Sequence, residues 1–304
     1  MQHSEMIMMQ NWDHVNEILS LLNQQPKNNN STDFSRVRNY LLDGQGQYWR
    51  QLIVSSKFMD PSLISSFKRY SKSISGQMKL RRKIRDDKAS VSNVVLPTGM
   101  KQVFQKVPTG SFQQQSKARV DYVVKHLLPL IHRNDQSHTL IYVPSYFDYC
   151  SLRNTMLKQE SFSNLFVSVT EYSRITEVGR GRARFLQGRK PIMLYTGRAH
   201  FFHRHSIKGI RNLIFLGLPE HPEFYSEYVN LITTTNNSSN HTNDHDNTDS
   251  MLVGHDDFSS YQNKDRSCIA LFTKYEAHAL ERIVGSSNCN RIMSSQNTTF
   301  MFSS

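Results

Sequence analysis

From residue 101 to the end of the chain, short apolar runs alternate with stretches in which apolar residues recur at helical spacing. Val120, Val123, Val124, Leu127 and Ile131, for example, fall on one face of a helix. Because strands that alternate with helices are typical of parallel sheets under a helical cover, the pattern predicts an α/β fold with a mostly parallel sheet. The expected strands are 102–107, 139–143, 165–169, 191–195, 212–216, 268–272 and 299–302.

The first hundred residues are patterned differently. Trp12 to Leu22 carry apolar residues on one helical face, the run RQLIVSS at 50–56 predicts a buried strand, and the Asp-Pro pair at 60–61 predicts the start of a helix. Residues 71–100 are polar, basic and weakly periodic, which is typical of a linker or a docking segment. We therefore expect three parts: 1–70, a basic linker at 71–100, and a larger domain at 101–304.

Side-chain spacing also predicts helix starts and one insertion within the larger domain. Ser145 with Asp148, and Thr273 with Glu276, have the spacing of capping boxes. Residues 233–265 are rich in Asn, Ser, Thr and Asp and carry a net charge of −5. A segment this polar cannot bury enough apolar surface to order itself, so we expect a disordered insertion there.

The positive charge is concentrated in two segments. The chain has 37 Lys and Arg against 25 Asp and Glu. Residues 174–211 hold 10 cations and one acid, Glu177, while residues 68–90 hold 9 cations and two acids. The combined net charge of these two segments exceeds the net charge of +12 of the whole chain, so the remaining residues are slightly acidic. Placed charge of this kind indicates a negatively charged partner, most often phosphate.

The stretch TGRAHFFHRHSIKG, from Thr196 to Gly209, interleaves cations, histidines and phenylalanines between two apolar runs. This composition predicts a nucleic-acid-facing loop at the edge of the sheet. The preceding GRGRARF at 179–185 is either a glycine-rich RNA-binding segment or the basic face of an amphipathic helix that starts after Ser173, and the spacing of its apolar residues favours the helix. Both versions would bind phosphate.

Three further motifs allow more than one interpretation. KLRRKIR at 79–85 is either a nuclear import signal or a solvated charged face. Tyr146, Phe147 and Tyr149 could stack on bases, although aromatic residues after a strand more often belong to a core or an interface. The three histidines at 200, 203 and 205 have no Cys, Asp or Glu nearby to complete a metal site, so we expect no metal there.

Cysteine usage and hydropathy exclude other classes of protein. Cys150, Cys268 and Cys289 are widely spaced and form no C-x-x-C pair, so neither a disulfide framework nor a cysteine zinc site is expected. A reducing compartment follows. No apolar run approaches the roughly 18 residues that a membrane span needs, and the first residues lack the pattern of a secretory signal. We expect no membrane partner and no secretion.

Several long motifs, in the same order, resemble one family. The motifs are MQNWDHV at 9–15, DFSRVR at 33–38, SHTLIYVPSYFDYCSLRN at 137–154, GRKPIMLYTGRAHFF at 188–202, IKGIRNLIFLGLPEHPEFYSEYVNLI at 207–232 and SCIALFTKYEAHAL at 267–280. In these motifs the chain resembles the U3 small nucleolar RNA-associated protein 25 family, also called digestive organ expansion factor, over nearly its whole length except the insertion.

The resemblance implies a RecA-like fold derived from a DEAD-box helicase with decayed catalytic motifs. It further implies a nuclear, nucleolar protein of the small-subunit processome, with pre-rRNA, U3 small nucleolar RNA and processome proteins as partners. Residues 1–70 then correspond to the end of a first RecA-like lobe and residues 101–304 to the second lobe. Gly197 departs from the family, which usually has an acidic residue between Thr196 and Arg198.

The helicase pattern can be tested against individual residues. A phosphate-binding P-loop needs a Gly-Lys pair, and this chain has none. The turn at Ser55, Ser56 and Lys57 stands where a helicase has its Ser-Ala-Thr motif, and 224–227 stand about where it has its arginine-rich motif. Without an arginine finger, phosphoryl transfer loses a factor of roughly 10³ or more. We therefore expect no catalytic residues and no cofactor.

The sequence thus predicts a non-catalytic pseudo-helicase scaffold that binds RNA and proteins during maturation of small-subunit ribosomal RNA. Two alternatives remain: a fragment of an active ATP-dependent RNA helicase, and a protein-only interaction module that docks through 217–228. The residues predicted to bind RNA are Lys79, Arg81, Arg82, Lys83, Arg180, Arg182, Arg184, Arg198, His200, Phe201, Arg204, Lys208 and Arg211.

Overall fold

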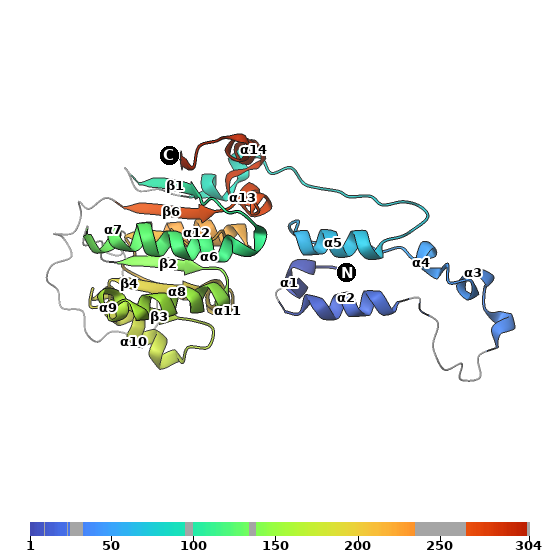
Figure 1. Ribbon diagram of the computed structural model, residues 1–304, viewed down its shortest axis with the longest axis horizontal. Helices are drawn as coiled ribbons and strands as arrows, with labels where there is room; N and C mark the ends of the chain where they lie inside the picture. Colours follow the sequence, from blue (N-terminus) through green and yellow to red (C-terminus); the bar gives the residue numbers. More distant parts are fainter. Residues whose placement is uncertain are drawn as a thin grey trace, which may run out of the picture. The chain divides into compact units, whose positions relative to one another are not determined.

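The computed structural model describes residues 1–8, 10–22, 24, 33–94, 100–133, 138–234 and 266–302. The chain divides into two compact units, Met1–Lys83 and Ile84–Ser304 (Figure 1). The predicted linker at 71–100 is divided between them, because Ala89 and Val91 are buried in the core of the second unit. Of the predicted insertion, residues 235–265 lie outside the described residues.

The first unit is built from short helices. Its two longest helices, α2 and α5, are joined by a hydrogen bond from Trp12 Nε1 to Ser66 Oγ at 3.0 Å. The predicted start of α5 is confirmed, because the Asp60 side chain accepts a hydrogen bond from the backbone N–H of Ser62. The helices are α1 (Ser4–Met8), α2 (Trp12–Leu21), η1 (Phe34–Arg36), α3 (Asn39–Leu42), α4 (Gly46–Trp49) and α5 (Pro61–Tyr70).

The prediction of a buried strand at 50–56 is wrong. This segment is extended, but it belongs to no sheet, and Ile53 is 75% exposed. Its backbone bonds the start of the chain instead: Ser55 N–H donates to the carbonyl of Met1, and Ser4 N–H donates to the carbonyl of Ser55. An apolar run becomes a buried strand only where other strands and helices cover it, and here that cover is not provided.

The second unit contains a seven-stranded sheet of order β3-β4-β2-β5-β6-β1-β7. Every neighbouring pair is parallel except β1 and β7, which are antiparallel. The predicted mostly parallel α/β sheet is therefore confirmed, with all seven strands within one residue of their predicted ends. The strands are β1 (Lys101–Lys106), β2 (Thr139–Val143), β3 (Phe166–Val169), β4 (Ile192–Thr196), β5 (Asn212–Phe215), β6 (Ser267–Phe272) and β7 (Thr299–Phe302).

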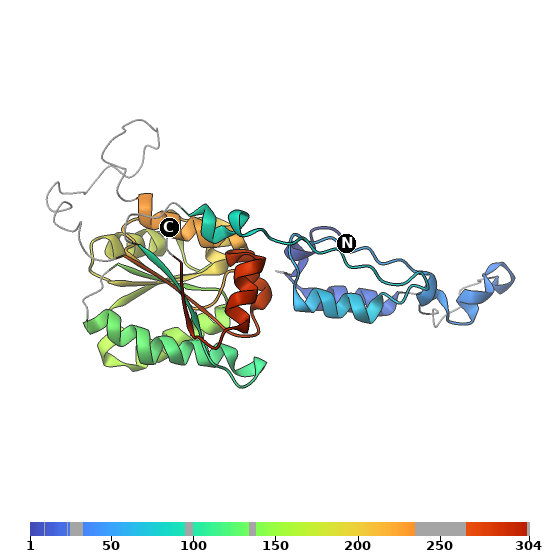
Figure 2. The same ribbon diagram turned by 90° about the horizontal axis from the view of Figure 1, so that it is seen from above.

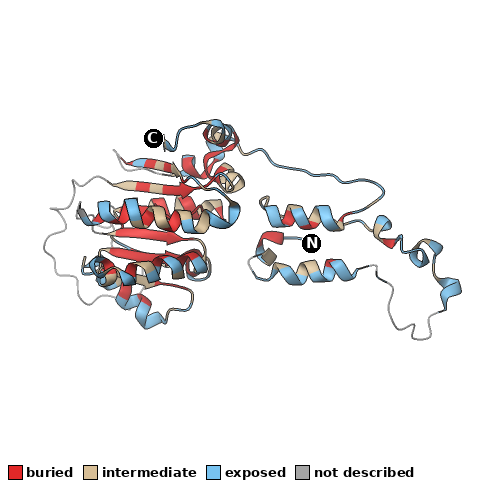
Figure 3. Cartoon of the chain, in the orientation of Figure 1, coloured by how far each residue is buried: buried red, intermediate tan, exposed pale blue. Residues whose placement is uncertain are grey.

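Helices cover both faces of this sheet and make a three-layer unit (Figure 2). One apolar core lies between the sheet and η3, α10, α11, α12, α13 and α14, and the other lies between the sheet and α6 to α9. The central strands β2, β4 and β5 are buried along their whole length, because helices cover them on both faces, and burial is drawn in red in Figure 3. The helices are η2 (Asp86–Lys88), η3 (Ser90–Asn93), η4 (Phe112–Gln114), α6 (Gln115–Tyr122), η5 (Val123–Leu127), α7 (Leu128–Arg133), α8 (Tyr146–Lys158), α9 (Glu160–Ser163), α10 (Ile175–Leu186), α11 (Gly197–His203), α12 (Pro222–Thr234), α13 (Ala277–Val284) and α14 (Ser286–Ser294).

The predicted helix through Val120 and Ile131 is confirmed as the continuous run α6, η5 and α7, whose middle section has π-type turns. Val120, Val123, Leu127 and Ile131 are all buried in the core beneath it. Within the described residues, no helix is both long and apolar enough to cross a membrane.

Candidate nucleic-acid interface

Helix α10 presents the arginines of GRGRARF to solvent. The helical interpretation of this motif is confirmed, although the helix begins after Arg174 and not after Ser173. Gly181 faces the sheet, where an added Cβ would lie 2.9 Å from Val167 Cγ2, so the helix packs closely on β3. Arg180 and Arg184 of this helix are exposed, and Arg182 is half-buried.

The predicted loop from Thr196 to Gly209 is wrong over its first half, which forms α11. Thr196 caps this helix, because its Oγ1 accepts a hydrogen bond from Ala199 N–H at 3.3 Å. The helix ends where Arg204 takes a left-handed conformation with φ 43°. The charged and aromatic composition of this stretch led to the prediction of an exposed loop. The amphipathic helix α11 instead buries some of these residues against the sheet.

His200 and Phe201 point inward from α11. His200 is 4% exposed, and its Nε2 lies 2.8 Å from Glu227 Oε2 on α12. Burial lowers the pKa of His200, although the hydrogen bond to Glu227 acts in the opposite direction. Phe201 packs on the core beside His221, with ring centroids 5.5 Å apart. Both residues therefore contribute to packing more than to an exposed binding surface.

The other predicted cations around α11 reach the surface to different degrees. Lys208 is exposed, whereas Arg211 is half-buried. The side chain of Arg204 is 56% exposed, and its Nη1 donates to Glu227 Oε1 at 2.6 Å. Arg198 is 47% exposed, with its Nε 3.7 Å from Glu171 Oε1.

The segment that follows α11 runs beside α10. A Cβ on Gly209 would lie 2.8 Å from Leu186 Cδ1 at the end of α10. Burial lowers the pKa of His205, and the charges of His203 and of half-buried Arg182 on α10 lower it further. The exposed cations of α10, of α11 and of the segment after α11 thus lie in the helical layer on one face of the sheet. We call the exposed residues Arg180, Arg184, Arg198, Arg204 and Lys208 the cationic stripe.

The remaining predicted RNA-binding cations lie in the first unit. Lys79, Arg81, Arg82 and Lys83 are all exposed, in a segment without helix or strand. Exposed cations in an irregular segment are able to follow a phosphate backbone.

Gly197 is required by a close approach at the start of α11. A Cβ at this position would lie 2.5 Å from the hydroxyl oxygen of Tyr142. The Tyr142 ring is buried and therefore cannot move aside freely. The space into which an acidic side chain would enter at residue 197 is thus occupied by Tyr142.

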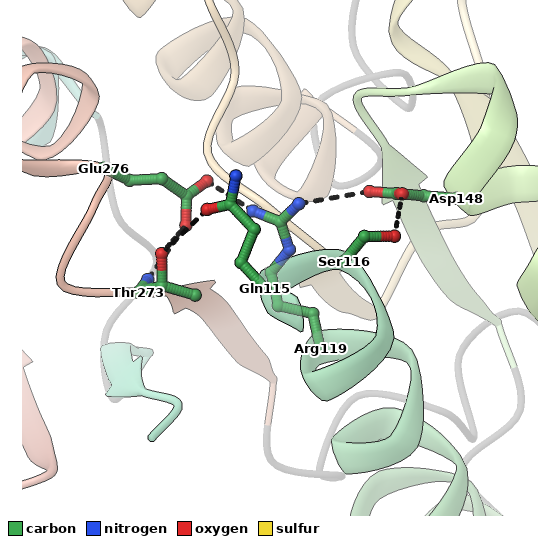
Figure 4. Close-up of polar contacts among 6 residues, drawn as sticks. All are labelled: Gln115, Ser116, Arg119, Asp148, Thr273 and Glu276. Atoms are coloured by element: carbon green, nitrogen blue, oxygen red, sulfur yellow. Dashed lines mark hydrogen bonds and ion pairs between the residues drawn. The ribbon is translucent and has the colours of Figure 1, made fainter. Parts of the chain in front are cut away.

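A buried polar cluster lies at the carboxyl ends of β2 and β6 (Figure 4). Arg119 on α6 donates to Asp148 Oδ2 at 3.1 Å and to Glu276 Oε1 at 2.5 Å, and Ser116 also bonds Asp148. Gly217 leaves room for the guanidinium, since its Cβ would lie 3.0 Å from Arg119 Nη1. The cluster links three segments that are distant in sequence.

The sequence pattern missed this cluster because it gave both acids local roles. The capping box at Ser145 is not formed, and Asp148 turns to Arg119 instead. At the second predicted box, Glu276 Oε2 does accept from Thr273 N–H at 2.8 Å, but α13 begins only after Glu276. The sequence shows Asp148 and Glu276 only at the spacing of a capping box, and the fold is needed to show that both acids also pair with Arg119.

The segments that were compared with the Ser-Ala-Thr and arginine-rich motifs of helicases make structural contacts within the chain. Ser56 Oγ and Lys57 N–H both donate to Glu5 Oε2, at 3.1 and 3.0 Å. Phe224 and Tyr225 are buried in the core. No three His, Cys, Asp or Glu side chains in the described part of the chain lie close enough together to hold a metal ion.

The run 217–228, proposed above as a docking surface for a protein-only module, is mostly buried. Leu218, Phe224, Tyr225 and Tyr228 are all less than 5% exposed. These side chains pack α12 onto the sheet and stabilise the second unit. That part of the alternative is therefore wrong.

The fold and the surface define a mostly parallel α/β protein with a basic helical face and without a Gly-Lys phosphate loop. The chain belongs to the U3 small nucleolar RNA-associated protein 25 family: the model "Utp25, C-terminal domain" matches residues 91–302, and "UTP25, NTP hydrolase-like domain" matches residues 1–78. This family is the one that the sequence motifs indicated.

Relatives in animals, fungi and plants match nearly the whole chain. It is 33% identical to U3 small nucleolar RNA-associated protein 25 homolog of Homo sapiens over 98% of its length, and 32% identical to U3 small nucleolar RNA-associated protein 25 of Chaetomium globosum over 98%. Protein NUCLEOLAR FACTOR 1 of Arabidopsis thaliana is 31% identical over 99%. The chain spans 36%, 39% and 35% of these relatives, respectively.

Similar solved structures include helicase domains. The second domain of the DEAD-box helicase Mss116p, bound to an RNA duplex, has a TM-score of 0.39 and 12% identity, over 59% of this chain and 56% of that one. S. cerevisiae Dbp5 bound to RNA and ADP BeF3 has a TM-score of 0.39 and 14% identity, over 86% of this chain and 55% of that one.

Proposed function

We propose that this chain is a non-catalytic scaffold of the small-subunit processome, which holds RNA and neighbouring proteins during pre-rRNA processing in the nucleolus. Family membership supports the proposed role in the processome, because relatives that match 98% of the chain are named for association with U3 small nucleolar RNA. Pre-rRNA and U3 small nucleolar RNA are therefore the proposed RNA partners.

The observation that carries the RNA-binding part of the proposal is the cationic stripe. Its residues come from α10, α11 and the segment after α11, yet they lie on one helical layer at one end of the sheet. Phosphate contacts supply most of the sequence-independent affinity for nucleic acid, and each contact releases counterions. Affinity for RNA should therefore fall steeply as salt is raised.

Charge reversal tests this proposal. The variant Arg180→Glu, Arg184→Glu and Lys208→Glu changes three exposed cations of the stripe. It should lower the slope of log affinity against log salt by about 2 for single-stranded RNA, since each phosphate contact contributes roughly 0.7. Fluorescence anisotropy of a labelled RNA measures the slope.

A matched control reverses three exposed lysines on the opposite helical layer, Lys117, Lys125 and Lys158. The control has the same change in net charge, so a general electrostatic effect would lower both slopes equally. Equal slopes for the two variants would place the RNA elsewhere and overturn the role of the stripe.

The biological part of the proposal has its own test. Depletion of the full-length protein should cause the unprocessed precursor of small-subunit ribosomal RNA to accumulate while the large-subunit RNA is spared. Northern blots of precursor RNAs measure this. Normal levels of both mature RNAs would contradict the proposed role.

A further inference from the structure

Exposed apolar side chains are grouped at the carboxyl ends of three neighbouring strands. Phe147 follows β2, Tyr172 and Ile175 follow β3, and Phe202 lies on α11 after β4; they are 85%, 68%, 90% and 58% exposed. These strands are adjacent in the order β3-β4-β2. We call these four residues the edge aromatic patch.

Members of the patch contact neighbouring side chains of the same loops. The rings of Tyr146 and Tyr172 meet edge to face with centroids 5.2 Å apart. Arg198 lies over the ring of Phe202, 5.8 Å from its centroid. The contact between Tyr146 and Tyr172 places Tyr172 beside the first turn of α8, on which Phe147 is exposed.

The patch does not serve the core of the second unit. Tyr149, two residues further along α8 and so on nearly the opposite side of the helix, is buried in that core, whereas Phe147 is exposed. Contiguous exposed apolar patches on a protein surface often mark binding sites. Of the aromatic residues after β2, Tyr149 thus packs in the core and Phe147 is exposed on the surface.

The charges around the patch indicate the kind of occupant. Arg198 and Arg174 are exposed beside it, and Arg180 lies one and a half turns further along α10. Two carboxylates lie near these arginines, and both are engaged within the chain. Glu171 is only 6% exposed and accepts a hydrogen bond from Thr196 Oγ1 at 2.8 Å, and the exposed Glu177 accepts one from the Arg174 backbone N–H at 3.3 Å. Aromatic rings next to arginines are typical of surfaces on which bases stack while the backbone is held by cations.

We propose that the edge aromatic patch binds single-stranded RNA, with bases stacked on Tyr172 and Phe147 and a phosphate held by Arg198. The inference rests on the proposed RNA-binding function and specifies the class of RNA. Duplex RNA hides the faces of its bases inside the helix, so only unpaired nucleotides present a surface to these rings. The cationic stripe then continues the path of the backbone.

A fluorescent base reports stacking directly. A single-stranded oligonucleotide that contains 2-aminopurine should lose emission when it binds the protein, because a ring stacked on the base quenches it. The variants Tyr172→Ala and Phe147→Ala should each restore emission and weaken binding about fivefold to a hundredfold, which corresponds to the loss of one stacked base. Tyr172→Phe keeps the ring and should retain the quenching.

Phe112→Ala is the matched control. Phe112 is 63% exposed, but it follows β1, three positions away from β2 in the sheet. This variant should quench and bind like the unmodified chain. If the two patch variants also bind and quench like the unmodified chain, the patch is not a stacking surface and the inference is overturned.

The salt slope separates this inference from the function on which it rests. If the stripe reversal lowers the slope while Tyr172→Ala leaves quenching and affinity unchanged, RNA binding stands and stacking fails. If the chain binds neither single-stranded nor duplex RNA, the proposed function itself fails. Tighter binding of duplex than of single-stranded RNA would also contradict the inference.

Discussion

Arg119 donates a hydrogen bond to Asp148 at 3.1 Å, and both side chains are less than a tenth exposed. The same guanidinium bonds Glu276, which follows β6, so one cation is shared by two acids from different parts of the chain. Charges buried in this way are costly to separate, because water cannot replace the missing partner. The cluster therefore fixes how α6, α8 and α13 meet at the carboxyl edge of the sheet (Figure 4).

Removal of the shared cation should destabilise the second unit strongly. Arg119→Met leaves Asp148 and Glu276 buried without their partner, for which a loss of about 3–5 kcal/mol in the free energy of unfolding is typical. Urea denaturation followed by circular dichroism measures it. Arg153→Met, which changes an exposed arginine on α8, should stay within about 0.5 kcal/mol. Similar losses for both variants would show that the cluster is not stabilising.

Stability should fall on acidification through the titration of His200. Burial lowers the pKa of His200 in the folded chain, so the unfolded chain binds this proton at a higher pH. Between the two pKa values the unfolded state holds more protons, and stability is therefore lost as the pH falls below about 6.5. His138 and His205 are shifted in the same direction, also mainly by burial.

Chemical denaturation at pH 7.5 and pH 5.5 measures this dependence. His200→Gln keeps a polar group beside Glu227, Arg204 and Tyr228 but does not titrate, so the difference between the two pH values should shrink. An undiminished difference in His200→Gln would assign the effect to other groups.

Gly197 and Tyr142 should be energetically coupled. Gly197→Ala places a Cβ 2.5 Å from the Tyr142 hydroxyl oxygen and should cost about 1–3 kcal/mol, as overpacking does. Tyr142→Phe removes that oxygen, so the double variant should recover part of the loss in a double-mutant cycle. Gly179→Ala, which meets nothing within 4 Å on α10, should instead stabilise by about 0.5–1 kcal/mol. If the changes in the free energy of unfolding of the two single variants add up in the double variant, the proposed clash between residue 197 and the Tyr142 hydroxyl is contradicted.

The purified chain should not hydrolyse ATP, with or without RNA. It has no Gly-Lys pair to hold phosphates, and the position compared with the arginine-rich motif carries buried Phe224 and Tyr225. A coupled phosphate-release assay measures turnover. Activity above a buffer blank that survives repurification, and follows the protein through a second column, would revive the helicase alternative.

The sequence alone determined the strands of the second unit, its helix through Val120 and Ile131, and the family. The strand run 139–143 and the helix through Val120 and Ile131 depend on local periodicity, which repeats along the chain and needs no distant partner. The arginine face of α10 was predicted in the same way. The segment 50–56 has the same kind of apolar pattern, but it is not a strand of the sheet, because a strand also needs neighbours.

Only the tertiary structure decided which polar and aromatic residues remain on the surface. His200 looked like a surface residue in sequence, but α11 turns it onto Glu227. Asp148 looked like a helix cap, yet α6 brings Arg119 to it from 29 residues away. Phe147 and Tyr149 are two residues apart, and the turn of α8 exposes one and buries the other. Such outcomes depend on contacts between distant segments, which no local pattern encodes.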